Sequence, residues 1–264
     1  MNSLRGLTIL VTRPDPSGTE LCELIDAHGG HAIHFPTIAF SPPSDSEAFK
    51  KSVAALGQMD WLVFISPQAV YSSIVAIRHA WPDFPPAIRF AAVGEGTANA
   101  LKAAGYLVSA FPGTEWNSEG LLKLPEFQSL AGKKIAIVRG QGGREFLANA
   151  LIDRGAKVEH VVAYQRTQPE SDVKPFLDLL KQKRIDVIIC TSFEGVQNLK
   201  RMIGEKSFPY LRDVPVIVVS ERIKMLARDL DFQTIWVAHN ASHPALLAAL
   251  AQKRDEICQI KQKK

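Results

Sequence analysis

Seven short runs along the chain are apolar at consecutive positions rather than at alternate ones. Strands of this kind are buried on both faces, which is typical of a parallel sheet covered by helices on each side. The runs predict strands at Thr8–Thr12, Trp61–Ile65, Phe90–Val93, Ile135–Val138, Val187–Cys190, Val216–Val219 and Ile235–Val237.

Amphipathic segments with helical spacing lie between these runs, and several of them begin at Ser, Thr or Pro and end at Gly. They predict helices at Gly18–His28, Ala69–Ala80, Thr97–Ala104, Arg144–Arg154 and Pro244–Lys253. Alternation of such strands and helices indicates a doubly wound α/β fold, and a length of 264 residues allows two domains of ordinary size.

The same succession of strands and helices occurs twice along the chain. The shift that places Asp60 on Asp186 aligns the two copies. With that shift and no gap, Ser66 falls on Ser192, Thr8–Gly30 lies over Lys134–Ala156, and Phe90–Val108 lies over Val216–Thr234. We infer that the chain is a duplicated βα unit.

Composition narrows the class of protein. The chain is 46% hydrophobic and 22% charged, as expected for a globular protein with a real core. A net charge of +4 without a basic, aromatic-rich stripe argues against nucleic acid and suits an anionic small ligand. The start lacks a signal-peptide pattern, and no apolar run reaches the roughly 20 residues of a membrane span. Three scattered cysteines indicate reduced thiols, a cytoplasmic location and no metal site.

Ligands of parallel sheets bind at the carboxyl ends of the strands, where helix starts present unpaired N–H groups. The loops at those positions are TRPDPSG, SPQ, GEGT, RGQGGRE, TSFEG, SERI and NASHP. They are rich in Gly, Ser and Thr, and Arg13, Arg139 and Arg144 are the nearby cations. The loops therefore predict a large ligand with several anionic groups, bound in a cleft between two domains.

The sequence fits other kinds of binding or catalytic site less well. RGQGGRE has Glu145 where a dinucleotide loop needs its third Gly, and no acidic residue follows to hold a ribose. No phosphate-binding GxxxxGK[ST] is present, and Ser66 and Ser192 lack the GxSxG context, so helix capping explains them. His239 and His243 do not share a helix face, because Pro244 follows. Tyr164, at the predicted end of a strand, is either a half-buried aromatic or a phenol facing the cleft; spacing alone favours the first.

Several stretches, in order over nearly the whole chain, resemble the uroporphyrinogen-III synthase family. They are ILVTRP, DWLVFISPQAV, AAVGEGTANAL, AAGY, GKKIAIVRGQGGRE, ALIDRGAKVEHVVAYQRTQP, IDVIICTSFEGV and SHPALLAAL. The resemblance implies two similar α/β domains, residues 1–35 plus 168–264 and residues 42–162. Segments 36–41 and 163–167 would pair as linker strands. The alternative is a simple division near Leu130.

The resemblance also implies an activity without cofactor or metal. The substrate would be hydroxymethylbilane, a linear tetrapyrrole polycarboxylate that closes with inversion of its last ring and loss of water. Tyr164 would assist departure of the hydroxyl group. The remaining implied or loop-derived substrate contacts are Arg13, Ser66, Gln68, Thr97, Arg139, Gly140, Gly142, Gly143, Arg144, Thr191, Ser192, Ser220, Arg222 and Ser242. The family often has Gly-Pro-Thr-Thr where this chain has SERI, so Arg222 would contact a carboxylate in place of a hydroxyl.

Two other function classes stay open at this point. A two-domain protein that binds an anionic small molecule without chemistry would share the same loops, and a dinucleotide oxidoreductase would bind NAD(P) or flavin. The implied partners are the tetrapyrrole substrate and a transient hand-over from hydroxymethylbilane synthase, with no nucleic acid and no membrane. We expect a monomer whose basic C-terminal tail is a solvated helix end.

Overall fold

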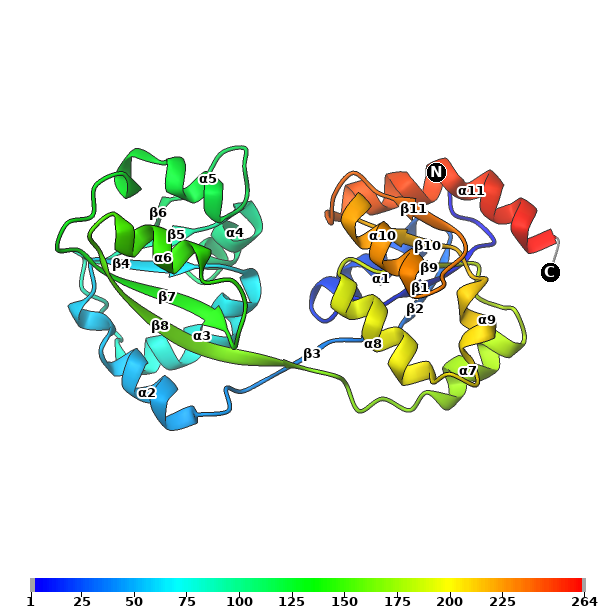
Figure 1. The fold of residues 1–264 in the computed structure, drawn as a ribbon, viewed down its shortest axis with the longest axis horizontal. Coiled ribbons are helices and arrows are strands. Elements are labelled where there is room, and N and C mark those ends of the chain that lie inside the picture. The colour runs from blue at the N-terminus through cyan, green and yellow to red at the C-terminus, as the bar shows by residue number, and fades with distance from the viewer. Residues whose placement is uncertain (1–2, 263–264) are drawn as a thin grey trace. The chain divides into compact units, whose positions relative to one another are not determined.

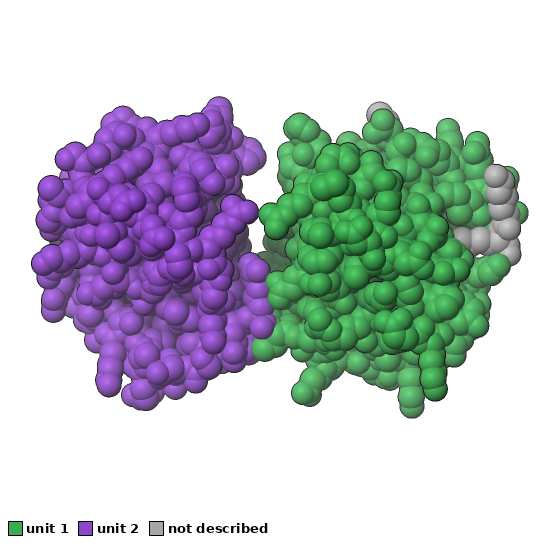
Figure 2. Space-filling model, viewed as in Figure 1, with its two compact units in different colours: residues 1–39, 167–264 green, residues 40–166 purple. Residues whose placement is uncertain are grey.

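The computed structural model describes residues 3–262 and divides into two compact units (Figures 1 and 2). Unit 1 is formed by residues 1–39 and 167–264, apart from the termini outside the described range, and unit 2 by residues 40–166. The chain passes from one unit to the other at 39/40 and 166/167, inside the predicted segments 36–41 and 163–167. The alternative boundary near Leu130 lies inside unit 2.

Unit 2 contains a six-stranded sheet in the order β3-β8-β7-β4-β5-β6. Strands β8, β7, β4, β5 and β6 run parallel to one another. The elements are β3 (Ala39–Ser41), α2 (Ser46–Ala54), β4 (Trp61–Phe64), α3 (Pro67–Ala80), β5 (Arg89–Ala92), α4 (Glu95–Ala103), β6 (Val108–Ala110), α5 (Ser118–Lys123), β7 (Lys134–Gly140), α6 (Phe146–Asp153) and β8 (Lys157–Thr167), with 3₁₀ turns at Leu56–Gln58 and Pro125–Phe127.

Unit 1 contains a five-stranded parallel sheet in the order β11-β10-β9-β1-β2. Its elements are β1 (Thr8–Val11), α1 (Ser17–Ala27), β2 (His31–His34), α7 (Lys174–Lys181), β9 (Val187–Ile189), α8 (Phe193–Ile203), α9 (Phe208–Arg212), β10 (Val216–Val218), α10 (Glu221–Asp229), β11 (Ile235–Val237) and α11 (His243–Gln262). The parallel α/β class predicted from the sequence is confirmed.

The two sheets repeat one another with one exchange. The order β6-β5-β4-β7-β8 in unit 2 corresponds, strand by strand along the internal repeat, to β11-β10-β9-β1-β2 in unit 1. However, β1 belongs to the first copy and lies beside β9 of the second, while β7 of the second copy lies beside β4 of the first. Each unit therefore combines parts of both copies.

The repeated aspartates sit at this exchange. The carboxylate of Asp60 accepts the backbone N–H of Lys134, the first residue of β7, at 2.8 Å. The carboxylate of Asp186 accepts the backbone N–H of Thr8, the first residue of β1, also at 2.8 Å. Because Thr8 and Lys134 are themselves equivalent in the repeat, each copy uses its Asp to hold the first strand of the other.

Helices cover both faces of each sheet. In unit 1, Ile9 and Val11 pack with α1 and α11, while Leu10 between them packs with α8 and α10 on the opposite face. In unit 2, α3 and α4 cover one face, and α5 and α6 cover the other. Consecutive strand residues point to opposite faces, so strands covered on both sides must be apolar throughout.

The predicted elements occur within about two residues of their predicted bounds, with one exception. Helix α11 ends at Gln262 instead of Lys253, and its Lys261 donates to the Asp186 carboxylate at 2.8 Å. The interpretation of the tail as a merely solvated helix end is therefore wrong for Lys261. Among residues 3–262, no helix combines the length and hydrophobicity that a membrane span requires.

Candidate functional site

The carboxyl ends of β4, β5, β7 and β8 lie along one edge of the unit 2 sheet, because these strands are parallel. Helix α3 begins at this edge, and Ser66 is its N-cap: the side-chain oxygen accepts the N–H of Ala69 at 3.1 Å. The capping role predicted for Ser66 is confirmed. It leaves the hydroxyl proton of Ser66 unused by the helix.

Tyr164 lies on β8 with its hydroxyl toward Ser66, at 3.1 Å between Oη and Oγ. The tyrosine is only 3% exposed, and the ring of Phe40 meets it edge-on at 5.3 Å between centroids. The strand runs on to Thr167, beyond its last partner in β7, because Gly140 pairs with Tyr164 and β3 lies on the other side of β8. At this point Gln141 donates its N–H to the Tyr164 carbonyl at 2.7 Å. The prediction that Tyr164 ends a strand is therefore wrong.

Gly140 lies directly against the tyrosine ring. A Cβ atom added to Gly140 would stand 2.6 Å from both Cε2 and Cζ of Tyr164, closer than carbon atoms approach. Only glycine allows β7 and the ring to come this near. The structure thus gives Gly140 a clear packing role, besides the carboxylate contact that the sequence analysis expected.

Arg139 ends the buried part of β7 and is 4% exposed. Its Nη1 pairs with the Glu145 carboxylate at 2.8 Å, and its Nη2 donates to the Gly142 carbonyl. Its Nε is buried and has no hydrogen-bond partner among residues 3–262. A buried guanidinium needs a carboxylate partner to offset its lost hydration. Glu145 is that partner for Arg139.

Glu145 also approaches His160, whose Nε2 lies 3.6 Å from the second carboxylate oxygen. Burial lowers the pKa of His160, and the positive charge of Arg139 lowers it further, whereas Glu145 acts in the opposite direction. The imidazole is therefore held toward its neutral form.

The loop after β7 exposes the remaining predicted contacts of this edge. Gly142 and Gly143 adopt positive φ angles of 73° and 99°, which glycine tolerates best. Both residues and Arg144 are exposed. Helix α6 begins only at Phe146, so the N–H groups of this loop belong to an irregular turn and not to a helix.

Gln68 and Thr97 occupy the first turns of α3 and α4. Gln68 is half-buried and donates its side-chain amide to the Ser72 hydroxyl at 2.8 Å. Thr97 is 2% exposed, so its hydroxyl lies inside unit 2 and not on the loop surface.

Unit 1 presents the corresponding edge with N-caps of its own. The side-chain oxygens of Ser192 and Ser220 accept N–H groups of α8 and α10 at 3.0 Å and 3.3 Å. The Ser242 hydroxyl accepts from Ala245 at 3.4 Å. Thr191 precedes Ser192 and is half-buried. These four predicted residues therefore share one edge, at the ends of β9, β10 and β11.

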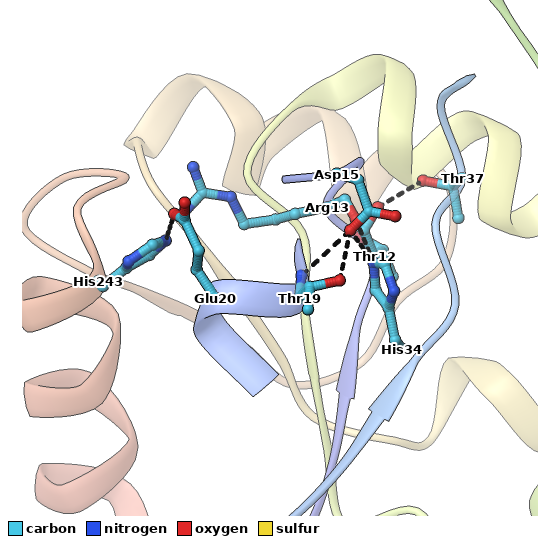
Figure 3. Close-up of polar contacts among 8 residues, drawn as sticks. All are labelled: Thr12, Arg13, Asp15, Thr19, Glu20, His34, Thr37 and His243. Carbon is cyan, nitrogen blue, oxygen red and sulfur yellow. Dashed lines mark hydrogen bonds and ion pairs between the residues drawn. The ribbon is translucent and has the colours of Figure 1, made fainter. Parts of the chain in front are cut away.

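Arg13 follows β1 at this edge and lies beside Glu20 and His243 (Figure 3). Its Nη1 donates to the carbonyl of Ala241 at 2.9 Å, and the Nε2 of His243 is 3.9 Å from the Glu20 carboxylate. Burial lowers the pKa of Arg13, while Glu20 raises it. Burial lowers the pKa of His243, and the charge of Arg13 adds to this, against smaller opposing effects of Glu20 and the Ser17 backbone.

Next to this cluster, Asp15 organises the loop before α1 (Figure 3). Its carboxylate accepts the hydroxyl of Thr19 at 2.6 Å and lies 3.9 Å from the Nε2 of His34. The same His34 nitrogen is 2.9 Å from the carbonyl oxygen of Arg13. Arg222, by contrast, is exposed on α10 and lines a hollow with Met225, away from these contacts.

Two residues of the unit 2 edge were not predicted from the sequence. Glu145 was noted only as a mismatch to a glycine motif, although its carboxylate holds Arg139. Trp116, in the loop before α5, is 53% exposed. The repeat offered a signal for it, because Trp116 is the equivalent of the predicted site residue Ser242.

Comparison with known proteins shows which family the chain resembles. The sequence profile of the family described as uroporphyrinogen-III synthase HemD matches residues 19–248. The uroporphyrinogen-III synthase of Escherichia coli (strain K12) is 38% identical over 248 residues, which cover 92% of this chain and 100% of that protein.

Solved structures share the fold. A mutant uroporphyrinogen III synthase from the extremely thermophilic bacterium Thermus thermophilus aligns with a TM-score of 0.57 and 16% identity, covering 98% of this chain and 100% of that one. The uroporphyrinogen-III synthetase of Helicobacter pylori 26695 aligns with a TM-score of 0.56 and 14% identity, covering 93% of this chain and 99% of that one.

Proposed function

The chain belongs to the uroporphyrinogen-III synthase family, and we propose that it converts hydroxymethylbilane to uroporphyrinogen III with its hydroxyl pair Ser66–Tyr164 at the reacting end of the substrate. The observation that carries the proposal is the 3.1 Å contact between these hydroxyls at the carboxyl-end edge of the unit 2 sheet.

The reaction begins with the terminal C–O bond of the substrate. The oxygen leaves with the bonding electrons, takes up a proton and departs as water, which leaves an electrophilic azafulvene. The substituted carbon of the last pyrrole attacks it to form a spiro intermediate, which fragments and recloses with that ring inverted. Without the enzyme, the chain closes to the uninverted isomer, so the protein must chiefly control which carbon reaches the electrophile.

The hydroxyl pair is suited to the first step. One hydrogen bond joins Ser66 and Tyr164, and each of them has one O–H proton. Whichever hydroxyl donates within the pair, the other keeps a proton that it can donate to the leaving oxygen. Such a donor in a buried position stabilises the charge that develops on that oxygen. Tyr164 is the group we assign to this role, with Ser66 orienting it.

The substrate carboxylates would be bound along the two sheet edges. In unit 2, Arg144 and the N–H groups of Gly142 and Gly143 are exposed for this purpose, with Arg139 beneath them. In unit 1, the capped helix starts near Arg13 offer the same kind of contact, since such starts attract anions.

The cysteines indicate in which cellular compartment the protein works. Cys22, Cys190 and Cys258 are free thiols, which suits a reducing compartment such as the cytoplasm.

Because unbound hydroxymethylbilane closes spontaneously, we propose that the protein acts as a monomer close to hydroxymethylbilane synthase and receives the substrate as it is released.

An isomer assay tests the proposal. Hydroxymethylbilane, freshly produced by its synthase, is incubated with and without this protein, and the oxidised uroporphyrin isomers are separated by chromatography. A shift from isomer I to isomer III that scales with the amount of protein supports the proposed activity. Unchanged isomer I with folded protein would leave a binding protein without turnover as the better explanation.

A further inference from the structure

A cavity of about 290 Å³ opens at the carboxyl-end edge of the unit 2 sheet. Apolar side chains form part of its wall: Ile65 and Val93, which directly follow β4 and β5, and Ile137 within β7. The segment that leads into α5 and the first turns of α6 complete it. All lining residues belong to unit 2, so the cavity exists within that unit alone.

Trp116 stands at the mouth of this cavity. Its backbone packs closely against Gly94, where an added Cβ atom would lie only 3.0 Å from the Trp116 Cβ. Its side chain is nevertheless 53% exposed. An indole with an open surface beside a cavity with apolar walls is suited to stack against a flat aromatic ring.

Two guanidinium groups and one carboxylate line the cavity. They are Arg139, Arg144 and Glu119. Arg139 is already paired with Glu145, whereas Arg144 makes no hydrogen bond or ion pair within residues 3–262. An exposed guanidinium with no partner is the natural ligand for a carboxylate, which it can bind through two parallel hydrogen bonds.

We propose that this cavity is a subsite for a single pyrrole ring, which stacks on Trp116 while one of its carboxylate side chains binds Arg144. Sites for small molecules usually measure about 300–1,000 Å³, so a cavity at the lower end of that range fits one substituted ring and not four. The assignment rests on the proposed function, because that function supplies a substrate built of pyrroles carrying acetate and propionate groups.

The probe for the subsite is porphobilinogen, a single pyrrole that carries one acetate and one propionate. Its binding to the full chain is measured by calorimetry for the wild type, Trp116→Ala, Trp116→Phe, Arg144→Gln and the control Leu107→Ala. Leu107 is 84% exposed and directly precedes β6, at the opposite edge of the sheet. We expect Trp116→Ala and Arg144→Gln each to weaken binding about tenfold, which corresponds to about 1.4 kcal/mol. Trp116→Phe and Leu107→Ala should stay within about twofold of the wild type.

The KM for hydroxymethylbilane and the product isomer, both from the isomer assay, separate the subsite hypothesis from the proposed function. If Trp116→Ala raises KM while the product remains isomer III, the subsite is supported. If the wild type makes isomer III but porphobilinogen does not bind, or binds all variants equally, the subsite is wrong and the proposed function stands. If the wild type makes no isomer III, the proposed function fails, whatever porphobilinogen does. Arg144→Gln, at an exposed position, keeps the test valid if Trp116→Ala does not fold.

Discussion

The hydroxyl of Tyr164 lies 3.1 Å from that of Ser66, although Tyr164 belongs to β8, Ser66 precedes α3, and most of unit 2 separates them along the chain. Ser66 is fixed because it caps α3, and Tyr164 is fixed because its ring lies against Gly140 and Phe40. A buried O–H donor is thus held in place by packing on both sides. Changes at either residue should therefore affect stability as well as turnover.

Ser66→Ala should cost more stability than Ser192→Ala. Both changes remove an N-cap, which is worth about 1 kcal/mol. Only Ser66→Ala also removes the partner of a buried tyrosine hydroxyl, which adds about 1 kcal/mol more. Urea unfolding of the two variants measures the difference, and equal losses would show that the Ser66–Tyr164 contact contributes nothing to stability.

Gly140→Ala should destabilise unit 2 by about 1–3 kcal/mol, because the new methyl group overlaps the Tyr164 ring and forces it to move. The matched control is Gly96→Ala in α4, where the nearest atom would be a Pro67 carbon at 3.7 Å. That change should be neutral or stabilising by up to about 1 kcal/mol, since alanine favours helix. Thermal unfolding compares them, and a harmless Gly140→Ala would contradict the close packing of β7 against the ring.

Asp186→Ala should be more damaging than Asp60→Ala. Each carboxylate holds the first N–H of a neighbouring strand, but the Asp186 side chain is 0% exposed whereas the Asp60 side chain is 36% exposed. Losing a buried charged acceptor should cost about 2–4 kcal/mol, and losing the exposed one about 1 kcal/mol. Denaturant midpoints give the comparison. The reverse order would mean that Lys261 and Thr8 do not depend on Asp186.

His160 should make stability depend on pH. Its pKa is lowered in the folded protein, chiefly by burial, so the unfolded chain binds a proton that the folded chain refuses. The free energy of unfolding should therefore decrease as the pH falls through about 6.5 and level off below the lowered pKa. His160→Gln should flatten this slope in urea titrations between pH 7.5 and 5. An unchanged slope would place His160 in a more open environment than the structure gives it.

Much of the fold follows from the sequence because both sheets are covered on both faces, which makes central strands such as β4 and β9 apolar throughout. The edge strand β2, His31–His34, has only two apolar residues, flanked by histidines, and is absent from the predicted strands, since an edge is partly exposed. Short β6, at the other sheet's edge, escaped for the same reason.

The candidate site, too, could be predicted only in part. Loops at strand ends were identifiable, because Gly, Ser and Arg cluster there for a physical reason. The contacts that give the residues their roles were not, since they join distant parts of the chain. Arg139 contacts Glu145 through a loop whose course depends on Gly142. Lys261 contacts Asp186 only because α11 packs along one face of the unit 1 sheet.

The most direct measurement is the rate and isomer composition of the product made from hydroxymethylbilane by the wild type and by Tyr164→Phe. We predict isomer III from both, with kcat about tenfold lower for Tyr164→Phe, a loss of about 1.4 kcal/mol of transition-state stabilisation, and KM little changed. Phenylalanine keeps the ring packing against Gly140 and removes only the hydroxyl. An unaltered kcat for Tyr164→Phe, or only isomer I from the wild type, would contradict the account.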